Sequence, residues 1–208
     1  MPAPADRPPL GGGSKPDRWR TGRRIAADVV TGVGIVVVLV LVAFLISGVW
    51  PPFVAIESGS MEPHINEGDL VFLVQGDRFD GDGGVAGTPY QTEESGVEDG
   101  HVAFGEPGHV VVFKPNGGEG TPIIHRLHFW VEAGENWYDR ADPDHLGAHR
   151  SCDELPNCPA PHAGFVTKGD NNGAYDQVDG QSAIVRPEWI EGRAALRVPY
   201  LGRLRVGF

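Results

Sequence analysis

The sequence predicts a mostly β fold preceded by one N-terminal transmembrane helix. Its 208 residues include 30 glycines and 18 prolines. That content excludes a mainly helical protein and is typical of short strands joined by many turns. One long run without charged residues lies near the N-terminus. We therefore expect a disordered basic tail at residues 1–24, an anchor helix at 25–50 and a β-rich domain at 51–208.

The anchor is predicted from 28 consecutive uncharged residues between Asp28 and Glu57. About 20 apolar residues in a helix are enough to cross a bilayer. The apolar region of a cleaved secretory signal is usually shorter, about 7–15 residues. Residues 1–24 contain six Lys or Arg against two Asp, so the positive-inside rule keeps the N-terminus in the cytoplasm. The sequence thus predicts a single-pass cell-membrane protein whose β-rich domain is extracytoplasmic.

Short apolar runs, rich in β-branched residues, follow the anchor. The turn residues Asn116-Gly117-Gly118 between two of them are typical of a hairpin. The segment from Gly76 to Gly100 is rich in glycine and acidic residues, which favours a solvated loop, and no helical pattern of useful length follows the anchor. The predicted strands are residues 70–74, 110–113, 123–131, 165–168, 184–186, 194–198 and 204–206.

The charge of the chain limits its partners. The formal net charge is −11, which makes nucleic acid a poor partner because phosphates are also negative. Only three lysines occur against 14 arginines. An acidic, lysine-poor surface suits solubility in strong salt, where screening offsets self-repulsion. This composition predicts a halophilic source.

Three distant segments carry the residue types that a hydroxyl nucleophile requires. Ser60 lies in a Ser-Gly-Ser turn, His125 lies inside an apolar run, and Asp176 follows a Gly-Asp-Asn-Asn segment. Each segment alone has an ordinary structural explanation, as a linker, a buried histidine or a turn. Together they supply a nucleophile, its general base and a carboxylate that orients the base.

At these residues the chain resembles the type I signal peptidases, in their archaeal and eukaryotic branch. Four of the family's motifs occur in order, and the likeness covers roughly residues 28–206. Bacterial members carry lysine where this chain has His125. The motifs are SGSMEP at 58–63, GHVVVFK at 108–114, His-Arg at 125–126, and Gly-Asp-Asn-Asn at 169–172 with a second aspartate at 176.

The resemblance implies an antiparallel β catalytic domain with an extended substrate groove. It also implies a membrane-anchored serine endopeptidase that removes N-terminal signal peptides from exported preproteins, with no cofactor and no metal. Its expected partners are signal peptides, the lipid membrane and the protein secretion channel. The predicted anchor and the acidic composition described above are both compatible with this function.

The resemblance also assigns roles to individual residues. It implies that Ser60 is the nucleophile, His125 the general base and Asp176 the third catalytic residue. Asp170 is implied as a supporting acid, and its place at the start of Asp-Asn-Asn suits it to hold the turn through backbone hydrogen bonds. Ser58 matches the position whose hydroxyl can assist the oxyanion hole in bacterial relatives.

The two cysteines, Cys152 and Cys158, admit three states. Outside the cytoplasm a disulfide is the favoured state. Free thiols are the second. A zinc site with His145 and His149 is the third, although the Cys-x5-Cys spacing is wider than that of most zinc fingers. None of these states is required for the chemistry expected of Ser60.

Two other functions fit part of the pattern. A non-catalytic, membrane-tethered β domain that binds exported peptides would need the anchor and a groove but no Ser/His/Asp set. A self-cleaving repressor-type protease would use a Ser–Lys dyad, with Lys114 or Lys168 as the base. The outside-facing domain and the histidine at the dyad position argue against this second function.

Overall fold

The computed structural model describes residues 18–79 and 84–203, with side chains described from Ile25 onward. The chain divides into two compact units, residues 1–41 and residues 42–208. The first contains most of a long helix, and the second contains the end of that helix and the β domain. The strand predicted at 204–206 and the tail at 1–17 lie outside the described residues.

The long helix α1 (Arg18–Ser47) is apolar enough to cross a membrane. Its segment Ile25–Ser47 has 23 residues and a mean hydropathy of 3.2, and at 1.5 Å per residue it spans roughly 34 Å. Its apolar side chains are almost all exposed, as expected of a helix that is hydrophobic all round and surrounded by lipid. The apolar span begins at Ile25, the residue where the anchor was expected to start. Residues 18–24, which were expected to belong to the disordered tail, are already helical, and the helix ends before Gly48, whose φ is +79°, rather than at residue 50.

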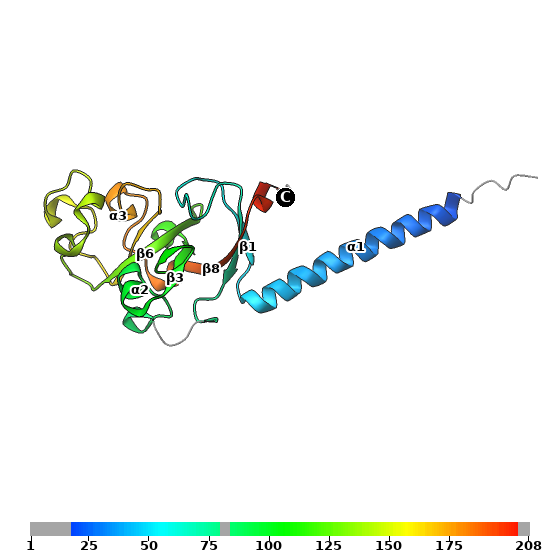
Figure 1. Cartoon of the computed structure of the whole chain (residues 1–208), viewed down its shortest axis with the longest axis horizontal. Helices are drawn as coiled ribbons and strands as arrows, with labels where there is room; N and C mark the ends of the chain where they lie inside the picture. The colour runs from blue at the N-terminus through cyan, green and yellow to red at the C-terminus, as the bar shows by residue number, and fades with distance from the viewer. Residues whose placement is uncertain (1–17, 80–83, 204–208) are drawn as a thin grey trace, which may run out of the picture. The chain divides into compact units, whose positions relative to one another are not determined.

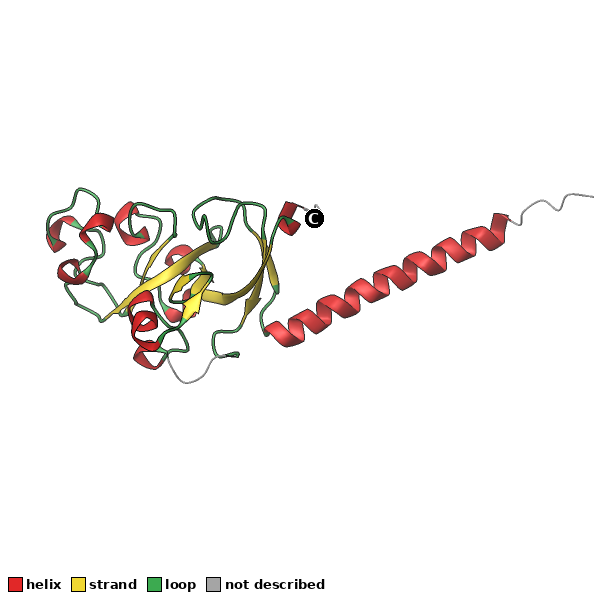
Figure 2. Ribbon diagram, in the orientation of Figure 1, coloured by secondary structure: helices red, strands yellow, loops and turns green. Residues whose placement is uncertain are grey.

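In the described residues the β domain is built on one six-stranded antiparallel sheet, with a separate two-stranded hairpin beside it (Figure 1). Figure 2 shows the strands in yellow among long loops and short helices. The order across the main sheet is β1-β2-β8-β5-β6-β7. Its strands are β1 (Phe53–Ala55), β2 (Leu70–Val74), β5 (Val110–Phe113), β6 (Ile123–Val131), β7 (Gly164–Lys168) and β8 (Ile190–Val198); the hairpin pairs β3 (Val102–Ala103) with β4 (Glu106–Pro107).

The prediction of a mostly antiparallel β domain is confirmed, and several of its strands lie where the sequence placed them. β5 and β6 form the predicted hairpin, with Phe113 opposite Ile123. Residues 184–186 are not a strand, because only Val185 pairs with its neighbour, as an isolated bridge to Phe165. The short strands β1, β3 and β4 were not predicted, since runs of two or three residues carry too little periodicity.

The expectation of a solvated loop without helix at Gly76–Gly100 is wrong for its second half. Helix α2 (Glu93–Asp99) forms there and packs against β6 (Figure 1). Thr92 caps its N-terminus in a capping box with Ser95, and Gly100 ends it in the left-handed region. The Thr-x-x-Ser spacing was a usable signal for this helix start.

Strand β5 is the centre of the domain because it is buried on both faces. Val110 and Val112 pack with Met61, Val71 and other residues of one apolar cluster. Val111 and Phe113 point to the other face and belong to a second cluster. A third cluster around Trp137 fills the space beside the far end of β6. The alternation explains why β5 reads as a continuous apolar run.

Candidate active site

His125 and Asp176 form a buried hydrogen-bonded pair. His125 is on β6, and Asp176 is the first residue of the short helix α3 (Asp176–Asp179). The His125 Nδ1 atom lies 2.7 Å from Asp176 Oδ2, and the two side chains are 2% and 0% exposed. Because a carboxylate oxygen accepts hydrogen bonds, Nδ1 is the donor and Nε2 is left as an acceptor. An imidazole in this tautomer can take a proton at Nε2.

The loop that carries Ser60 is held from both sides. On one side Met61 is fully buried in the apolar cluster with Val110 and Val112. On the other side Asn171 donates its backbone N–H to the Ser60 carbonyl at 2.8 Å and its side-chain amide to the Gly59 carbonyl at 3.1 Å. The second residue of Asp-Asn-Asn therefore fixes the serine turn.

Gly169 allows these groups to come close together. A Cβ atom at this position would lie 2.6 Å from the Ser60 carbonyl oxygen and 2.8 Å from His125 Nε2. Both distances are shorter than real Cβ contacts allow. The residue must therefore be glycine if the serine loop and the imidazole are both to approach it this closely.

Ser60 and His125 line one cleft of about 620 Å³. The walls of this cleft come from β1 and the residues after it, from the start of β6, and from the segment after β7. Its lining combines aliphatic side chains with a few polar groups. The lining residues are Val54, Ala55, Ile56, Glu57, Ser58, Ser60, Val112, Thr121, Pro122, Ile123, Ile124, His125, Asn172 and Gln181.

The Ser60 hydroxyl lies beside Ser58. The two Oγ atoms are 3.4 Å apart, and either can be the donor. Among the described residues no hydrogen bond joins Ser60 to His125. The structure thus brings Ser58, Ser60 and His125 to one cleft, with the His125 imidazole oriented by its hydrogen bond to Asp176.

Asp170 occupies a different environment from Asp176. Its carboxylate accepts two hydrogen bonds from Arg126, from Nε at 2.8 Å and from Nη2 at 2.7 Å, and it lies 2.8 Å from His64 Nδ1. The Nη1 group of Arg126 donates to four backbone carbonyls, those of Ala103, Glu106, Pro107 and Gly108. The expectation that Asp170 holds its turn by backbone hydrogen bonds is wrong, because Arg126 and His64 occupy its oxygens.

The electrostatics of Asp170 follow from these contacts. Burial favours the neutral carboxyl and raises its pKa, but the hydrogen bonds and charges of Arg126 and His64 outweigh burial, so the pKa of Asp170 lies below its ordinary value. Arg126 and Asp170 are 2% and 6% exposed. This buried ion pair joins β6 to the segment after β7 and to the β3–β4 hairpin.

The two lysines of the β domain, Lys114 and Lys168, have partners elsewhere. Lys114 pairs with Glu191 at 3.4 Å. The Lys168 ammonium donates to the carbonyls of Gly169 and Asn172, at 3.0 and 3.2 Å. Neither lysine lines the cleft of Ser60. His125, by contrast, does line it.

Cys152 and Cys158 are joined in a disulfide. It closes a loop that packs on the third apolar cluster, through Leu155 and Cys158. His145 and His149 hydrogen-bond backbone carbonyls, those of Gly173 and Leu146. None of these four residues lines the Ser60 cleft.

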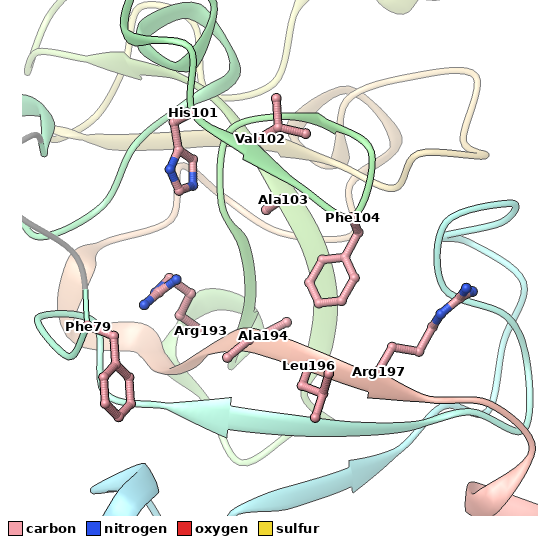
Figure 3. A pocket seen from close by; sticks show the side chains of 10 residues that line it. Phe79, His101, Val102, Ala103, Phe104, Arg193, Ala194, Leu196 and Arg197 are labelled. Atoms are coloured by element: carbon pink, nitrogen blue, oxygen red, sulfur yellow. The ribbon is translucent and has the colours of Figure 1, made fainter.

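A second cleft of about 550 Å³ lies between the β3–β4 hairpin and β8 (Figure 3). Phe104 from the hairpin turn and Leu196 from β8 both line it, together with Arg193 and Arg197. Ser60, His125 and Asp176 are not among its lining residues. It is distinct from the cleft that holds the predicted site.

Sequence reasoning did not identify Asn171, His64, Thr167 and Gln177 as contributors to the site. Asn171 was part of a motif and was read only as a turn residue. The Thr167 hydroxyl bonds Asp176, and the Gln177 amide bonds Thr167. A threonine in a strand and a glutamine in a short helix carry no pattern of their own.

No protein-family model matches the chain. The functional conclusion therefore depends on the motifs and on the geometry of the site.

Proposed function

We propose that the protein is a membrane-anchored serine endopeptidase that cleaves N-terminal signal peptides from exported preproteins. The observation that carries this proposal is the buried His125–Asp176 pair, whose free Nε2 lies beside Gly169 at the Ser60 loop. The membrane-spanning length of α1 supports an anchor. The resemblance to type I signal peptidases supplies the substrate class.

In the proposed reaction Ser60 Oγ attacks the carbonyl carbon of the scissile peptide bond while His125 Nε2 takes the hydroxyl proton. Asp176 holds the imidazole in the tautomer that leaves Nε2 free, and it stabilises the imidazolium that forms. His125 then returns the proton to the leaving amine, and water hydrolyses the acyl-enzyme by the same route in reverse. The Ser58 hydroxyl, beside Ser60 Oγ, is placed to donate to the developing oxyanion.

The cleft suits an extended peptide. Among the described residues β1 pairs only with β2, and Ile123 and Ile124 of β6 pair only with β5. Both segments line the cleft, so a substrate strand between them would find backbone partners on either side. Signal peptides carry small residues at the first and third positions before the cut. The aliphatic walls provide shallow pockets for such residues.

The proposed location follows from the charges and from α1. The basic N-terminus stays in the cytoplasm by the positive-inside rule, and the domain lies at the outer surface of the cell membrane. Ser60 follows the end of α1 by only 13 residues. In the proposed arrangement a connection this short would keep the site near the bilayer, within reach of a membrane-held signal peptide and the secretion channel. The acidic composition favours a halophilic source and an assay at high salt.

The test is cleavage of a preprotein by the purified full-length chain in liposomes at high salt. We expect a shortened product whose new N-terminus follows the small residues, and no product with Ser60→Ala. Ser151→Ala, which alters a serine away from the cleft, is the matched control and should cleave normally. A preprotein with a bulky residue immediately before the cut should resist the enzyme.

Two results would contradict the proposal. Cleavage by Ser60→Ala at the wild-type rate would show that Ser60 is not the nucleophile. Stable binding of the preprotein without any cleavage would favour the non-catalytic peptide-binding domain instead.

A further inference from the structure

We infer that Thr167 is a positioning residue of the catalytic pair, fixed for that role by Gln177. Thr167 is on β7 and is fully buried, as are Asp176 and Gln177. Its hydroxyl donates to Asp176 Oδ2 at 2.7 Å, the same oxygen that accepts from His125 Nδ1. This inference rests on the proposed function and adds to it the residue that holds the orienting carboxylate.

Gln177 determines the direction of the Thr167 hydroxyl. The backbone N–H of Thr167 donates to Gln177 Oε1 at 3.0 Å, which fixes the orientation of the amide. Gln177 Nε2 therefore faces the Ala183 carbonyl at 3.0 Å and Thr167 Oγ1 at 3.3 Å. A hydroxyl has one proton. Because its oxygen already accepts from Gln177, that proton goes to Asp176.

The position of Thr167 on an edge strand makes this arrangement available. β7 is the last strand of the sheet among the described residues, and on its outer side only Phe165 bonds to a neighbouring backbone, through the bridge to Val185. Helix α3 replaces a neighbouring strand at Thr167. Its first residue, Asp176, takes the hydroxyl, and its second, Gln177, takes the backbone N–H. Two adjacent residues thus bind one threonine.

The consequence concerns the freedom of the Asp176 carboxylate. Its Oδ1 atom is buried and has no hydrogen-bond partner among the described residues. Only the two bonds to Oδ2 hold the group, and the last torsion of an aspartate side chain is soft. Without the Thr167 hydroxyl, the carboxylate can turn away from the geometry that selects the His125 tautomer. The loss would then fall on kcat rather than on substrate binding.

The test compares Thr167→Val with Thr167→Ser. Valine keeps the shape and removes the donor, so kcat should fall about 10- to 100-fold, as expected for one hydrogen bond to a charged group, with KM nearly unchanged. Serine restores the hydroxyl and should recover most of kcat. Thr88→Val is the matched control, since the Thr88 hydroxyl donates to the Val85 carbonyl and accepts from the Tyr90 N–H, and neither bond involves the cleft of Ser60; it should keep the wild-type kcat.

A second readout needs no substrate. The proton on His125 Nδ1 should give a low-field NMR resonance in the resting protein, and Asp176→Asn should remove it. We expect Thr167→Val to broaden or shift this resonance and Thr167→Ser to restore it. If the protein cleaves no preprotein, this resonance still decides the role of Thr167 and only the proposed function fails.

Three outcomes would overturn the inference. One is a folded Thr167→Val protein with wild-type kcat and an unchanged resonance. Another is the absence of the resonance in the wild type. The third concerns a second variant, which is needed if Thr167→Val does not fold. Gln177→Leu frees the Thr167 hydroxyl to rotate, so it should lower kcat and broaden the resonance. A Gln177→Leu protein with wild-type kcat and an unchanged resonance would refute the proposed role.

Discussion

Replacing Asp170 with asparagine should destabilise the domain far more than it affects the chemical step. Asp170 is the only carboxylate bonded to Arg126 in the described part of the chain, and it receives both Nε and Nη2 of that guanidinium. Asparagine keeps the shape but loses the negative charge, and it can turn an NH₂ group toward the guanidinium. Arg126 then remains as a buried positive charge without a counter-charge.

The magnitude follows from burial. Removing one partner of a buried ion pair costs about 3–5 kcal/mol in the free energy of unfolding. We take the lower end, about 3 kcal/mol, because Arg126 keeps its four backbone acceptors and an amide oxygen remains. For a domain of this size, 1 kcal/mol changes Tm by about 2–4 °C, which gives a decrease of roughly 6–12 °C.

The effect should also depend on pH. Because the pKa of Asp170 is lowered in the folded protein, its contribution to stability is fully present above the unfolded value of about 4. It is lost as the pH falls through the lower folded pKa. The Tm difference between the wild type and Asp170→Asn should therefore be constant near neutral pH and narrow below about pH 4.

The assay is thermal unfolding followed by circular dichroism at matched salt, from neutral pH down to pH 3. Asp144→Asn, which neutralises an exposed carboxylate, is the matched control and should change Tm by little. An Asp170→Asn protein that melts like the wild type but cleaves nothing would refute the reasoning. It would make Asp170 a catalytic residue and not a structural one.

Three further predictions concern the site and its surroundings. Asp176→Asn should keep the fold, by circular dichroism, while turnover falls about 10⁴-fold, because an amide no longer selects the tautomer of His125; near-normal turnover would contradict this. Replacing Cys152 and Cys158 together with serine should cost about 2 kcal/mol of stability, because the closed loop is short, and should leave cleavage nearly intact; loss of turnover in the folded variant would contradict it. Gly169→Ala should abolish cleavage because its Cβ would meet the Ser60 carbonyl and His125 Nε2, whereas Gly173→Ala, with nothing within 4 Å of its Cβ, should be active; comparable rates for the two variants would show that the close approach is not required.

The parts of the fold that the sequence predicted are those with a strong local pattern. β2, β5 and β6 are apolar runs with turn residues beside them, and their bounds match the structure. The edge strand β1 was missed because three residues after two prolines show no alternation. Residues 184–186 were read as a strand because Ile184 and Val185 are β-branched and apolar, but in the described structure they form only one bridge to β7.

The site was predictable to the extent that its residues have characteristic chemistry. Ser60, His125 and Asp176 stand out as types, and the structure brings them together. The residues that support them could not be found in this way. Whether Asn171 binds the serine loop and whether Thr167 faces Asp176 depend on how β7 ends and where α3 begins, which are tertiary features. Arg126 was part of the His-Arg motif, but its pairing with Asp170 depends on the same tertiary features.

The separation of the two aspartates follows from the geometry of β6. Successive side chains of a strand point to opposite faces of the sheet, so His125 and Arg126 need partners on opposite faces. The chain that leaves β7 supplies both: Asp170 meets Arg126, and Asp176, six residues later, meets His125. Gly169 and Asn171 lie within this passage and contact the serine loop. One short segment therefore bonds Arg126 through one aspartate and orients the His125 imidazole through the other. Neither aspartate can replace the other, because exchanging their roles would require His125 to face the side of the sheet that Arg126 occupies.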